Sequence, residues 1–291
     1  MHADFPALVS AEWLSTNIHD PQICVIDATF HMPHTNRNAA DEFTHEHLPG
    51  AVFFDIDKVA DHTSTLPHML PSGEEFGSAV ATLGMTNDTL AVVYDTHGLM
   101  SAARLWWMFR IFGHDRVTVL DGGLPAWKRL PGPLAQGPST PKPSHRPFVT
   151  HFRPELVRTQ TLVANAIDDP QTAIIDARGS ARFSGQAPEP RAGVRSGHIP
   201  GSISLPYTEL LNERGELLCT DELTQRFAQA GISAKREIIA SCGSGVTACV
   251  LALGLAQTGR WDVAVYDGSW SEWGADPAAP IELGDGAVSP R

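Results

Sequence analysis

The sequence predicts an α/β fold that is built twice, as two tandem domains. Three observations lead to this prediction: four segments recur in the same order, each copy alternates short apolar runs with helical patterns, and a proline-rich stretch lies between the copies. A chain of 291 residues is long enough for two domains. Because alternating strands and helices form parallel βαβ units, we expect a mainly parallel sheet flanked by helices in each half.

The repeat consists of four pairs of matching segments. The pairs are 23–28 with 173–177, 47–51 with 198–202, 92–98 with 239–245, and 121–127 with 267–273. The offset stays nearly constant, at 149 residues from Asp27 to Asp176 and 146 residues from Asp121 to Asp267. Several ordered matches at one spacing indicate an internal duplication, so each copy is expected to bury a core of its own.

The elements can be assigned in chain order from their apolar patterns. In the first copy, runs at 23–28, 90–94 and 117–120 predict strands, and the pattern at 101–112 predicts a helix. In the second copy, runs at 173–177 and 238–241 predict strands, and apolar residues spaced along 247–257 predict a helix. Prolines at 131, 133, 138, 141, 143 and 147 indicate an extended connector. The predicted organisation is an N-terminal domain at 8–130, a linker at 131–154 and a C-terminal domain at 155–280.

Composition excludes several classes of protein. Lys and Arg total 21 against 33 Asp and Glu, and the formal net charge of −12 disfavours nucleic-acid binding. No apolar run approaches the roughly 18 residues of a membrane span, and the first residues lack a basic and apolar leader, so we expect a soluble, cytoplasmic protein with no membrane partner. Four cysteines without a C-x-x-C pair do not form a disulfide framework and fit a reducing compartment.

The residue with the most chemical promise is Cys242, which stands between the end of one predicted strand and the start of the following helix. Amide groups of a tight turn and the positive end of a helix dipole favour a thiolate there. The alternative is a buried structural cysteine, since free cysteine is among the most buried residue types. The matching position in the first copy is Asp95, so only the second copy is predicted to be catalytic.

The turn after Cys242 argues against phosphate chemistry. A cysteine phosphatase needs an arginine six residues after its cysteine to hold phosphate, and that residue here is Ala248. The segment 241–259 contains neither Lys nor Arg. Small residues in the turn allow its amide groups to crowd around one point, as a thiolate or persulfide would require.

These features together resemble the tandem rhodanese-type sulfurtransferases, and within them the members that use 3-mercaptopyruvate. The resemblance rests on the repeat, the His-Leu/Ile-Pro-Gly motifs, the Asp-Gly-x-x-x-x-Trp segments and the Cys-Gly-Ser-Gly-Val-Thr turn, and it extends from about Leu8 to Trp273. It implies that Cys242 takes sulfur from 3-mercaptopyruvate as a persulfide and passes it to thioredoxin, a low-molecular-weight thiol or cyanide. It implies no metal and no organic cofactor.

The resemblance also implies roles for the surrounding residues. Arg182 and Arg191 would hold the carboxylate and keto group of the substrate, and His47 and Ser244 would relay a proton. The remaining predicted substrate-binding residues belong to the turn itself: Gly243, Gly245, Val246 and Thr247.

Several alternatives remain open at this level. Each arginine could form a surface ion pair, and His47 could be a hydrogen-bonded structural histidine in a turn common to both copies. For the whole protein, the alternatives are a thiosulfate:cyanide sulfurtransferase and a persulfide carrier that does not turn over a small substrate. Thiosulfate is a dianion and favours cationic residues in the turn, whereas Gly243 and Ser244 are neutral.

Overall fold

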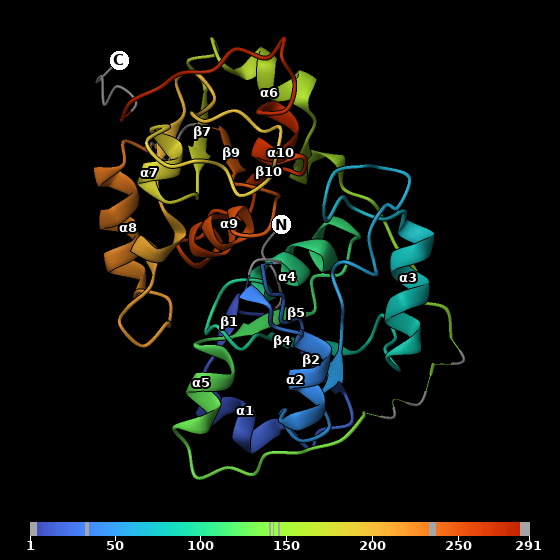
Figure 1. Cartoon of the computed structure of the whole chain (residues 1–291). Coiled ribbons are helices and arrows are strands. Elements are labelled where there is room, and N and C mark those ends of the chain that lie inside the picture. The colour runs from blue at the N-terminus through green and yellow to red at the C-terminus, as the bar shows by residue number, and fades with distance from the viewer. Residues whose placement is uncertain are drawn as a thin grey trace. The chain divides into compact units, whose positions relative to one another are not determined.

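The computed structural model describes residues 5–32, 35–139, 141, 143–144, 146–232 and 237–285 and divides into two compact units (Figure 1). Unit 1 comprises the chain up to His62 together with Leu70–Arg153 and Asn212–Leu217. Unit 2 comprises Thr63–Met69, Pro154–Leu211 and the chain from Leu218 onward. Thr63–Met69 therefore belongs to unit 2, although it lies in the first half of the sequence.

Unit 1 contains a five-stranded parallel sheet with the strand order β1-β5-β4-β2-β3. Its strands are β1 (Leu8–Val9), β2 (Ile23–Asp27), β3 (Val52–Phe53), β4 (Leu90–Tyr94) and β5 (Val117–Leu120). Its helices are α1 (Ala11–Asn17), α2 (Ala39–His45), α3 (Gly73–Thr82), α4 (Ala102–Ile111) and α5 (Gly123–Lys128). The strands β4 and β5 coincide with the predicted runs.

Helices cover both faces of this sheet, which explains the almost continuous apolar character of β4. One core cluster joins Leu14 of α1 and Trp127 of α5 to Val25 and Val92 of the central strands. The alternate residues of those strands point to the opposite face, where α4 packs on β4 and β5. The α3 helix begins with a capping box between Ser72 and Glu75 and packs its Phe76 against α4.

Unit 2 repeats the same strand order, as β6-β10-β9-β7-β8, again with parallel pairing throughout. Its strands are β6 (Val157–Arg158), β7 (Thr172–Asp176), β8 (Ile203–Ser204), β9 (Glu237–Ser241) and β10 (Ala264–Tyr266). Its α-helices are α6 (Gln160–Ala166), α7 (Ser180–Phe183), α8 (Thr220–Gln229), α9 (Ala248–Gln257) and α10 (Ser269–Trp273), with short 3₁₀ turns at Pro154–Leu156 and Tyr207–Leu210. The prediction of two α/β domains with parallel sheets is confirmed.

The core of unit 2 lies on both sides of the central strand β9. On one side, Val163 of α6 and Trp270 and Trp273 of α10 pack with Ile239 of β9. On the other side lies α9, which contacts β9 and β10 and is apolar around its whole circumference. Residues 248–256 of α9 are all buried, as expected for a helix covered on every side.

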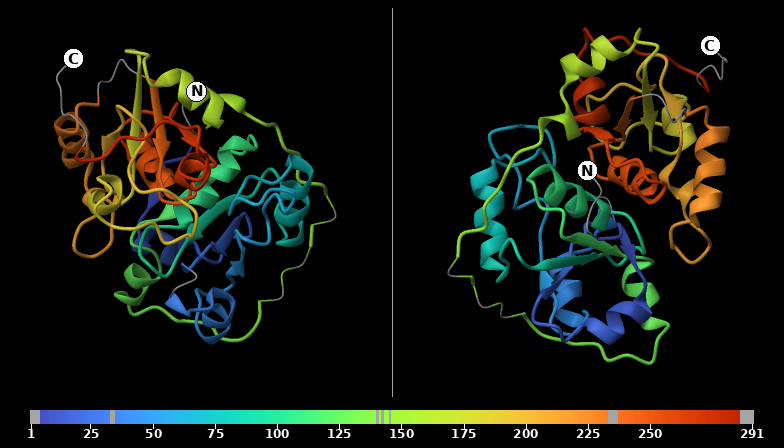
Figure 2. Two further views of the ribbon diagram at one scale, coloured as in Figure 1. Left: turned by 45° about the horizontal axis from the view of Figure 1, so that its top comes forward. Right: turned by 180° about the vertical axis from the view of Figure 1, so that it is seen from behind.

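The proline-rich connector runs along the outside of unit 1 as far as Arg153 (Figure 2). Main-chain hydrogen bonds attach it to the unit: Ala135 pairs with His47, and the amide groups of His151 and Arg153 donate to carbonyl groups at the end of α4. Asn87 exchanges hydrogen bonds with the main chain of Val149. The described part of the connector is therefore packed along unit 1.

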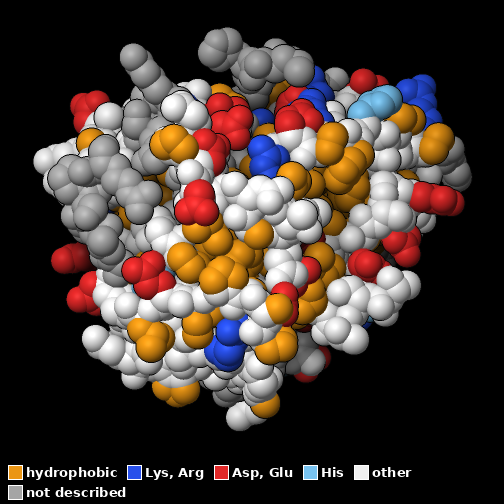
Figure 3. All heavy atoms as spheres, turned by 90° about the horizontal axis from the view of Figure 1, so that it is seen from above, with side chains coloured by type: hydrophobic (Ala, Val, Ile, Leu, Met, Phe, Trp, Pro, Cys, Tyr) orange, Lys and Arg blue, Asp and Glu red, His pale blue; other side chains and the backbone are white. Residues whose placement is uncertain are grey.

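The surface charges and the state of the cysteines agree with the expectations drawn from the composition. On the face drawn in Figure 3, acidic and basic side chains are interspersed with apolar ones, and no continuous basic area is seen among the described residues there. All four cysteines are free. Within the described ranges, no helix combines the length and hydropathy needed to cross a membrane.

A buried histidine gives unit 1 a pH-dependent stability. His114 lies beside the rings of Phe109 and Phe148, and its Nε2 is 3.1 Å from the carbonyl oxygen of Thr89. Burial lowers the pKa of His114 from 6.5 to about 4. Below pH 6.5 the unfolded chain gains a proton at this position that the folded chain does not bind.

The contribution of His114 to the free energy of unfolding should therefore fall as the pH decreases from about 6.5 to about 4. The loss attributable to His114 is at most about 1.4 kcal/mol per pH unit. His114→Gln should remove this contribution, so the free energy of unfolding of the parent minus that of the variant should decrease as the pH falls through this window, which urea unfolding at a series of pH values can measure. Asp27 and Asp121, whose pKa values burial raises to about 6, act in the opposite direction but are present in both proteins. Equal pH slopes for the variant and the parent would contradict this assignment.

Candidate functional site

Cys242 follows directly after β9, at the carboxyl end of the central strand of unit 2. The same end of the sheet holds Asp176, the last residue of the neighbouring strand β7, and Asp176 pairs in register with Ser241. The residues 242–247 form the turn into α9, as the sequence predicts, and Cys242 is 2% exposed. Ligands of open parallel sheets bind outside the carboxyl ends of the strands, where neighbouring connections leave in opposite directions.

Ser269 at the start of α10 holds this turn by its main chain. The Oγ of Ser269 accepts hydrogen bonds from the amide of Cys242 at 3.2 Å and from the amide of Gly245 at 3.1 Å. The same hydroxyl donates to the carbonyl oxygen of Tyr266 at 2.7 Å. One buried hydroxyl therefore connects the two ends of the 242–245 turn to the last residue of β10.

The next two residues of α10 hold the carbonyl side of the turn. The amide of Trp270 donates to the carbonyl oxygen of Cys242 at 2.9 Å. Ser271 donates twice to the carbonyl oxygen of Gly243, from its amide at 2.8 Å and from its Oγ at 2.6 Å. Its Oγ also accepts a hydrogen bond from Nη1 of Arg191 at 3.3 Å. Arg191 is thus one side chain away from the residue that follows Cys242.

Arg182, on α7, lies directly against Gly243. A Cβ atom at position 243 would be 3.0 Å from Nη2 of Arg182, so any side chain there would press on the guanidinium group. Glu189 holds this group with both carboxylate oxygens, at 2.5 Å from Nη2 and 3.2 Å from Nε. This fork uses one edge of the guanidinium group, and its side chain remains 28% exposed. The structure therefore brings both predicted arginines to Gly243.

A second, fully buried arginine fixes the position of Glu189. Arg178 binds the carboxylate of Asp176 through Nε and Nη2 and donates from Nη1 to Glu189 at 2.8 Å. Its guanidinium carbon lies 4.3 Å from the ring centroid of Trp270, a cation–π contact. Burial alone would lower the pKa of Arg178, but the two carboxylates outweigh it and raise the pKa. The end of β7, Glu189 and α10 are therefore joined through one cation.

The corresponding turn in unit 1 binds an anion from its own sequence. The buried carboxylate of Asp95 accepts hydrogen bonds from the amide groups of His97 at 2.9 Å, Met100 at 2.8 Å and Ala102 at 2.8 Å. The amide of Leu124 donates to the Asp95 carbonyl oxygen, as that of Trp270 does to Cys242. The first copy thus demonstrates that the turn after the central strand can surround a negative charge with main-chain donors.

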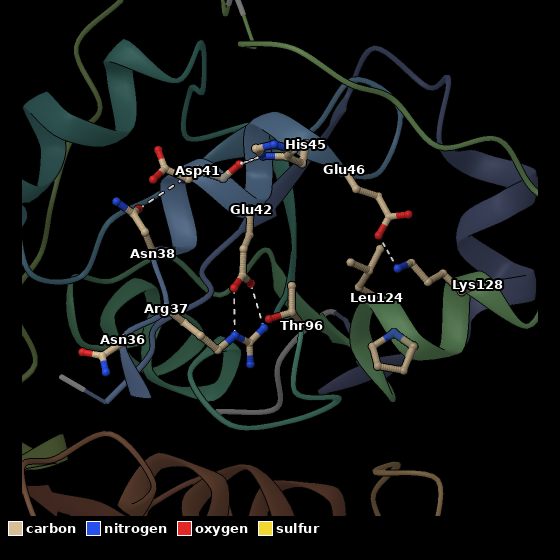
Figure 4. Close-up of a pocket in the computed structure, with 11 residues that line it drawn as sticks. Asn36, Arg37, Asn38, Asp41, Glu42, His45, Glu46, Thr96, Leu124 and Lys128 are labelled. Carbon is tan, nitrogen blue, oxygen red and sulfur yellow. Dashed lines mark hydrogen bonds and ion pairs between the residues drawn. The ribbon is translucent and has the colours of Figure 1, made fainter. Parts of the chain in front are cut away.

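Unit 1 also has a polar pocket of about 610 Å³ beside this turn (Figure 4). Thr96, next to Asp95, contributes to its wall. The two cations that line it are each paired with a carboxylate, Arg37 with Glu42 and Lys128 with Glu46. No group of three or more His, Cys, Asp or Glu side chains within the described residues could hold a metal ion.

His47 has the same surroundings as its counterpart in the other copy. Its Nδ1 is 2.7 Å from the carbonyl oxygen of Phe43, and its ring stacks on the Phe43 ring at 4.1 Å. His198 is 2.9 Å from the carbonyl oxygen of Phe183 and stacks on that ring at 3.8 Å. Both histidines also form an antiparallel bridge with a later segment. These contacts match the structural alternative for His47.

Another histidine from the first half of the sequence belongs to the unit of Cys242. His68 lies in Thr63–Met69, which is part of unit 2, and it is 6% exposed. Its backbone is left-handed, with φ of 60°, a conformation that costs energy in a residue other than glycine and is frequent at functional sites. In the sequence His68 lacks metal-ligand spacing, and no spacing of residues reveals which unit the loop at Thr63–Met69 joins.

The remaining predicted residues all lie in the turn. Ser244, Gly245 and Val246 are buried, and Thr247 is partly exposed immediately before α9. Four residues of the site were missed at the sequence level: Arg178, Glu189, Ser269 and Ser271. A signal for Ser269 was present, because the repeat aligns Asp267-Gly268-Ser269 with Asp121-Gly122-Gly123 and so places serine where the first copy has glycine.

Comparisons with known proteins agree with this architecture. A family model described as a rhodanese-like domain matches twice, at residues 10–130 and 159–276. The 3-mercaptopyruvate sulfurtransferase of Escherichia coli is 48% identical over 94% of this chain and 97% of its own length. The thiosulfate sulfurtransferase of Rattus norvegicus is 42% identical, over 92% of each chain.

A solved structure extends the agreement to three dimensions. The crystal structure of SseA from Escherichia coli, described as having the rhodanese fold of 3-mercaptopyruvate sulfotransferases, superimposes with a TM-score of 0.83. It is 45% identical in sequence and covers 91% of this chain and 99% of that one. Since the family model matches both copies and the relatives align over almost their whole length, the chain belongs to the rhodanese family and is a sulfurtransferase with two rhodanese-like domains.

Proposed function

We propose that this protein transfers sulfur from 3-mercaptopyruvate, through a persulfide on Cys242, to a thiol acceptor, with release of pyruvate. The observation that carries the proposal is the convergence of two arginines on Gly243, the residue that follows Cys242. Arg182 contacts it directly and Arg191 reaches it through Ser271. Two guanidinium groups close to the residue after Cys242 suit a substrate that joins a carboxylate and a keto group to a sulfur atom.

The first half of the reaction is a displacement at sulfur. The Cys242 thiolate attacks the sulfur of 3-mercaptopyruvate, an S–S bond forms, and the bond between sulfur and C3 of the substrate breaks. The electron pair of that bond leaves as the enolate of pyruvate, which takes up one proton at C3. Arg182 and Arg191 would stabilise the enolate, and the amides of the turn would stabilise the sulfur. A thiolate acceptor then attacks the outer sulfur and regenerates Cys242.

The choice of 3-mercaptopyruvate over thiosulfate rests on the residues, because relatives of both names are similar to this chain. Thiosulfate carries two negative charges and has no planar carboxylate for a guanidinium fork. The turn itself contributes no cation, and Glu189 neutralises part of the charge of Arg182. This balance favours a monocarboxylate. A thiosulfate:cyanide sulfurtransferase remains the second candidate.

A persulfide carrier without turnover is less compatible with the arginines, which a carrier would not need.

For the acceptor, we propose thioredoxin or a low-molecular-weight thiol, with cyanide as a substitute in the assay. No metal or organic cofactor enters the scheme, and the cytoplasmic location stays a prediction.

The Cys242→Ser variant tests the persulfide, and a comparison of two sulfur donors separates the candidate functions. It should lose sulfur transfer by at least about 10³-fold, since a serine hydroxyl cannot form a persulfide. In the parent protein, kcat/KM should be higher with 3-mercaptopyruvate than with thiosulfate, measured with cyanide as common acceptor. Equal or higher kcat/KM with thiosulfate would reject the proposed substrate. Transfer that survives in Cys242→Ser would reject the persulfide.

The arginine fork can be tested from both of its partners. Arg182→Gln should lower kcat/KM for 3-mercaptopyruvate by roughly 10- to 100-fold, or about 1.5–3 kcal/mol, if it makes a charged hydrogen bond to the substrate. Glu189→Gln should lower it less, because Arg182 stays present but loses half of its fork. Arg226→Gln is the matched control, because Arg226 pairs with Glu209 through partly exposed side chains of unit 2. Parent-like kinetics in Arg182→Gln would remove the carboxylate grip.

Two histidines are candidates for the proton transfer to the enolate. The sequence motifs suggest His47 together with Ser244, and His68 is a second candidate because it belongs to unit 2. If the relay uses His47, His47→Asn should lower kcat at least about 10²-fold while His198→Asn, which loses the same structural contacts, lowers only the melting temperature. The same kcat loss confined to His68→Asn would instead assign the proton transfer to His68. Stopped-flow detection of pyruvate release, together with thermal unfolding, distinguishes these outcomes.

A further inference from the structure

Ser269 adopts a backbone conformation that a glycine adopts at the corresponding position of the first copy. Its φ is 50°, in the left-handed region, and its side chain is fully buried. The counterpart Gly123 has φ of 52°. A Cβ atom there would come within 2.2 Å of the carbonyl oxygen of Asp95, so the first copy has no room for a side chain. The second copy has made room for serine and accepts an unfavourable backbone conformation.

The hydroxyl of Ser269 is completely used by hydrogen bonds. A serine hydroxyl has one donor and two acceptor sites. In this structure the donor binds the carbonyl oxygen of Tyr266, and the acceptor sites bind the amides of Cys242 and Gly245. Without this oxygen, two amide groups at a buried turn would lose this acceptor. The strain at Ser269 therefore coincides with a specific contact to the nucleophile's own main chain.

The two copies differ in what satisfies the amides of the turn. In the first copy, the carboxylate of Asp95 binds the amides of His97 and Met100, which correspond to Ser244 and Thr247 in the second copy. In the second copy, the Oγ of Ser269 accepts hydrogen bonds from two different amides, those of Cys242 and Gly245. Ser269 therefore does not bind the amides of Ser244 and Thr247. These are the positions whose counterparts in the first copy donate to the carboxylate of Asp95.

We infer that Ser269 is a positioning residue for sulfur transfer: it fixes both ends of the 242–245 turn so that the amides of the turn converge on the sulfur of Cys242. This inference rests on the proposed persulfide chemistry of Cys242. Fixing the amides before the reaction begins stabilises negative charge on sulfur without reorganisation of the turn. The role concerns the thiolate and persulfide, not the binding of the carboxylate, which belongs to Arg182 and Arg191.

Ser269→Gly and Ser269→Ala test the inference together. Glycine relieves the left-handed strain and restores the residue of the first copy, so this variant should fold at least as stably as Ser269→Ala, which keeps the strain. Both lose the acceptor of two buried amides. We expect kcat to fall roughly 30- to 100-fold in both variants, with KM for 3-mercaptopyruvate changed less than about threefold. Ser202→Ala, at a buried serine elsewhere in unit 2, serves as the control and should keep parent kinetics.

The second readout is the reactivity of the thiol itself. The pH at which alkylation of Cys242 by iodoacetamide is half-maximal should rise by about one unit in both variants, because the thiolate loses oriented amide donors. Mass spectrometry of the peptide that contains Cys242 separates it from the exposed Cys219. A residue that only supports the fold would change the melting temperature without moving this midpoint.

Parent values of kcat and of the alkylation midpoint in Ser269→Gly would overturn the inference. So would parent kinetics in Ser269→Ala combined with a loss in Ser269→Gly, since the Cβ atom and not the hydroxyl would then matter. The alkylation measurement requires no sulfur donor. A shifted midpoint in a protein that does not use 3-mercaptopyruvate would therefore reject the proposed substrate while keeping Ser269 as the positioning residue.

Discussion

The structure of this protein depends on how the main-chain amides of one turn are satisfied. A turn between the central strand and the next helix gathers several buried N–H groups, and a buried donor without a partner costs more than an ordinary hydrogen bond gains. In unit 1 the carboxylate of Asp95 provides the partner from within the turn. In unit 2 the corresponding residue is Cys242, and α10 provides an oxygen from outside the turn at Ser269. The two copies of one fold thus satisfy the same turn in two different ways.

The second constraint is the placement of positive charge in a protein with a net charge of −12. The field of the whole molecule does not attract an anion, so the attraction has to be local. It is provided by guanidinium groups that are oriented by carboxylates: Asp176 and Glu189 hold Arg178, and Glu189 also holds Arg182. The carboxylates lower the net charge around these guanidinium groups but fix their geometry; under the proposed function, this geometry suits a planar monoanion better than a compact dianion.

Much of the fold was predictable because it is written in local patterns. The apolar runs at Leu90–Tyr94 and Val117–Leu120 became β4 and β5 without change, and the pattern at 247–257 became α9. The repeat predicted the second sheet from the first. The position of Cys242 between strand and helix followed from the same patterns. Local patterns could not assign a role to Glu189. Its carboxylate binds Arg178 and Arg182, and these contacts form only when the chain folds.

Two α/β domains, an aspartate at position 95 where the repeat has Cys242, and Cys242 with two arginines as the candidate site were all predictable from the sequence, because periodicity and residue chemistry are local properties. Which side chains meet depends on the folded chain. The tertiary structure placed Arg182 against Gly243, gave His47 the same contacts as His198, assigned His68 to unit 2, and revealed Ser269 beneath the Cys242 turn. These relations join residues far apart in the chain, and packing and hydrogen-bond geometry fix them only once the sheet has formed.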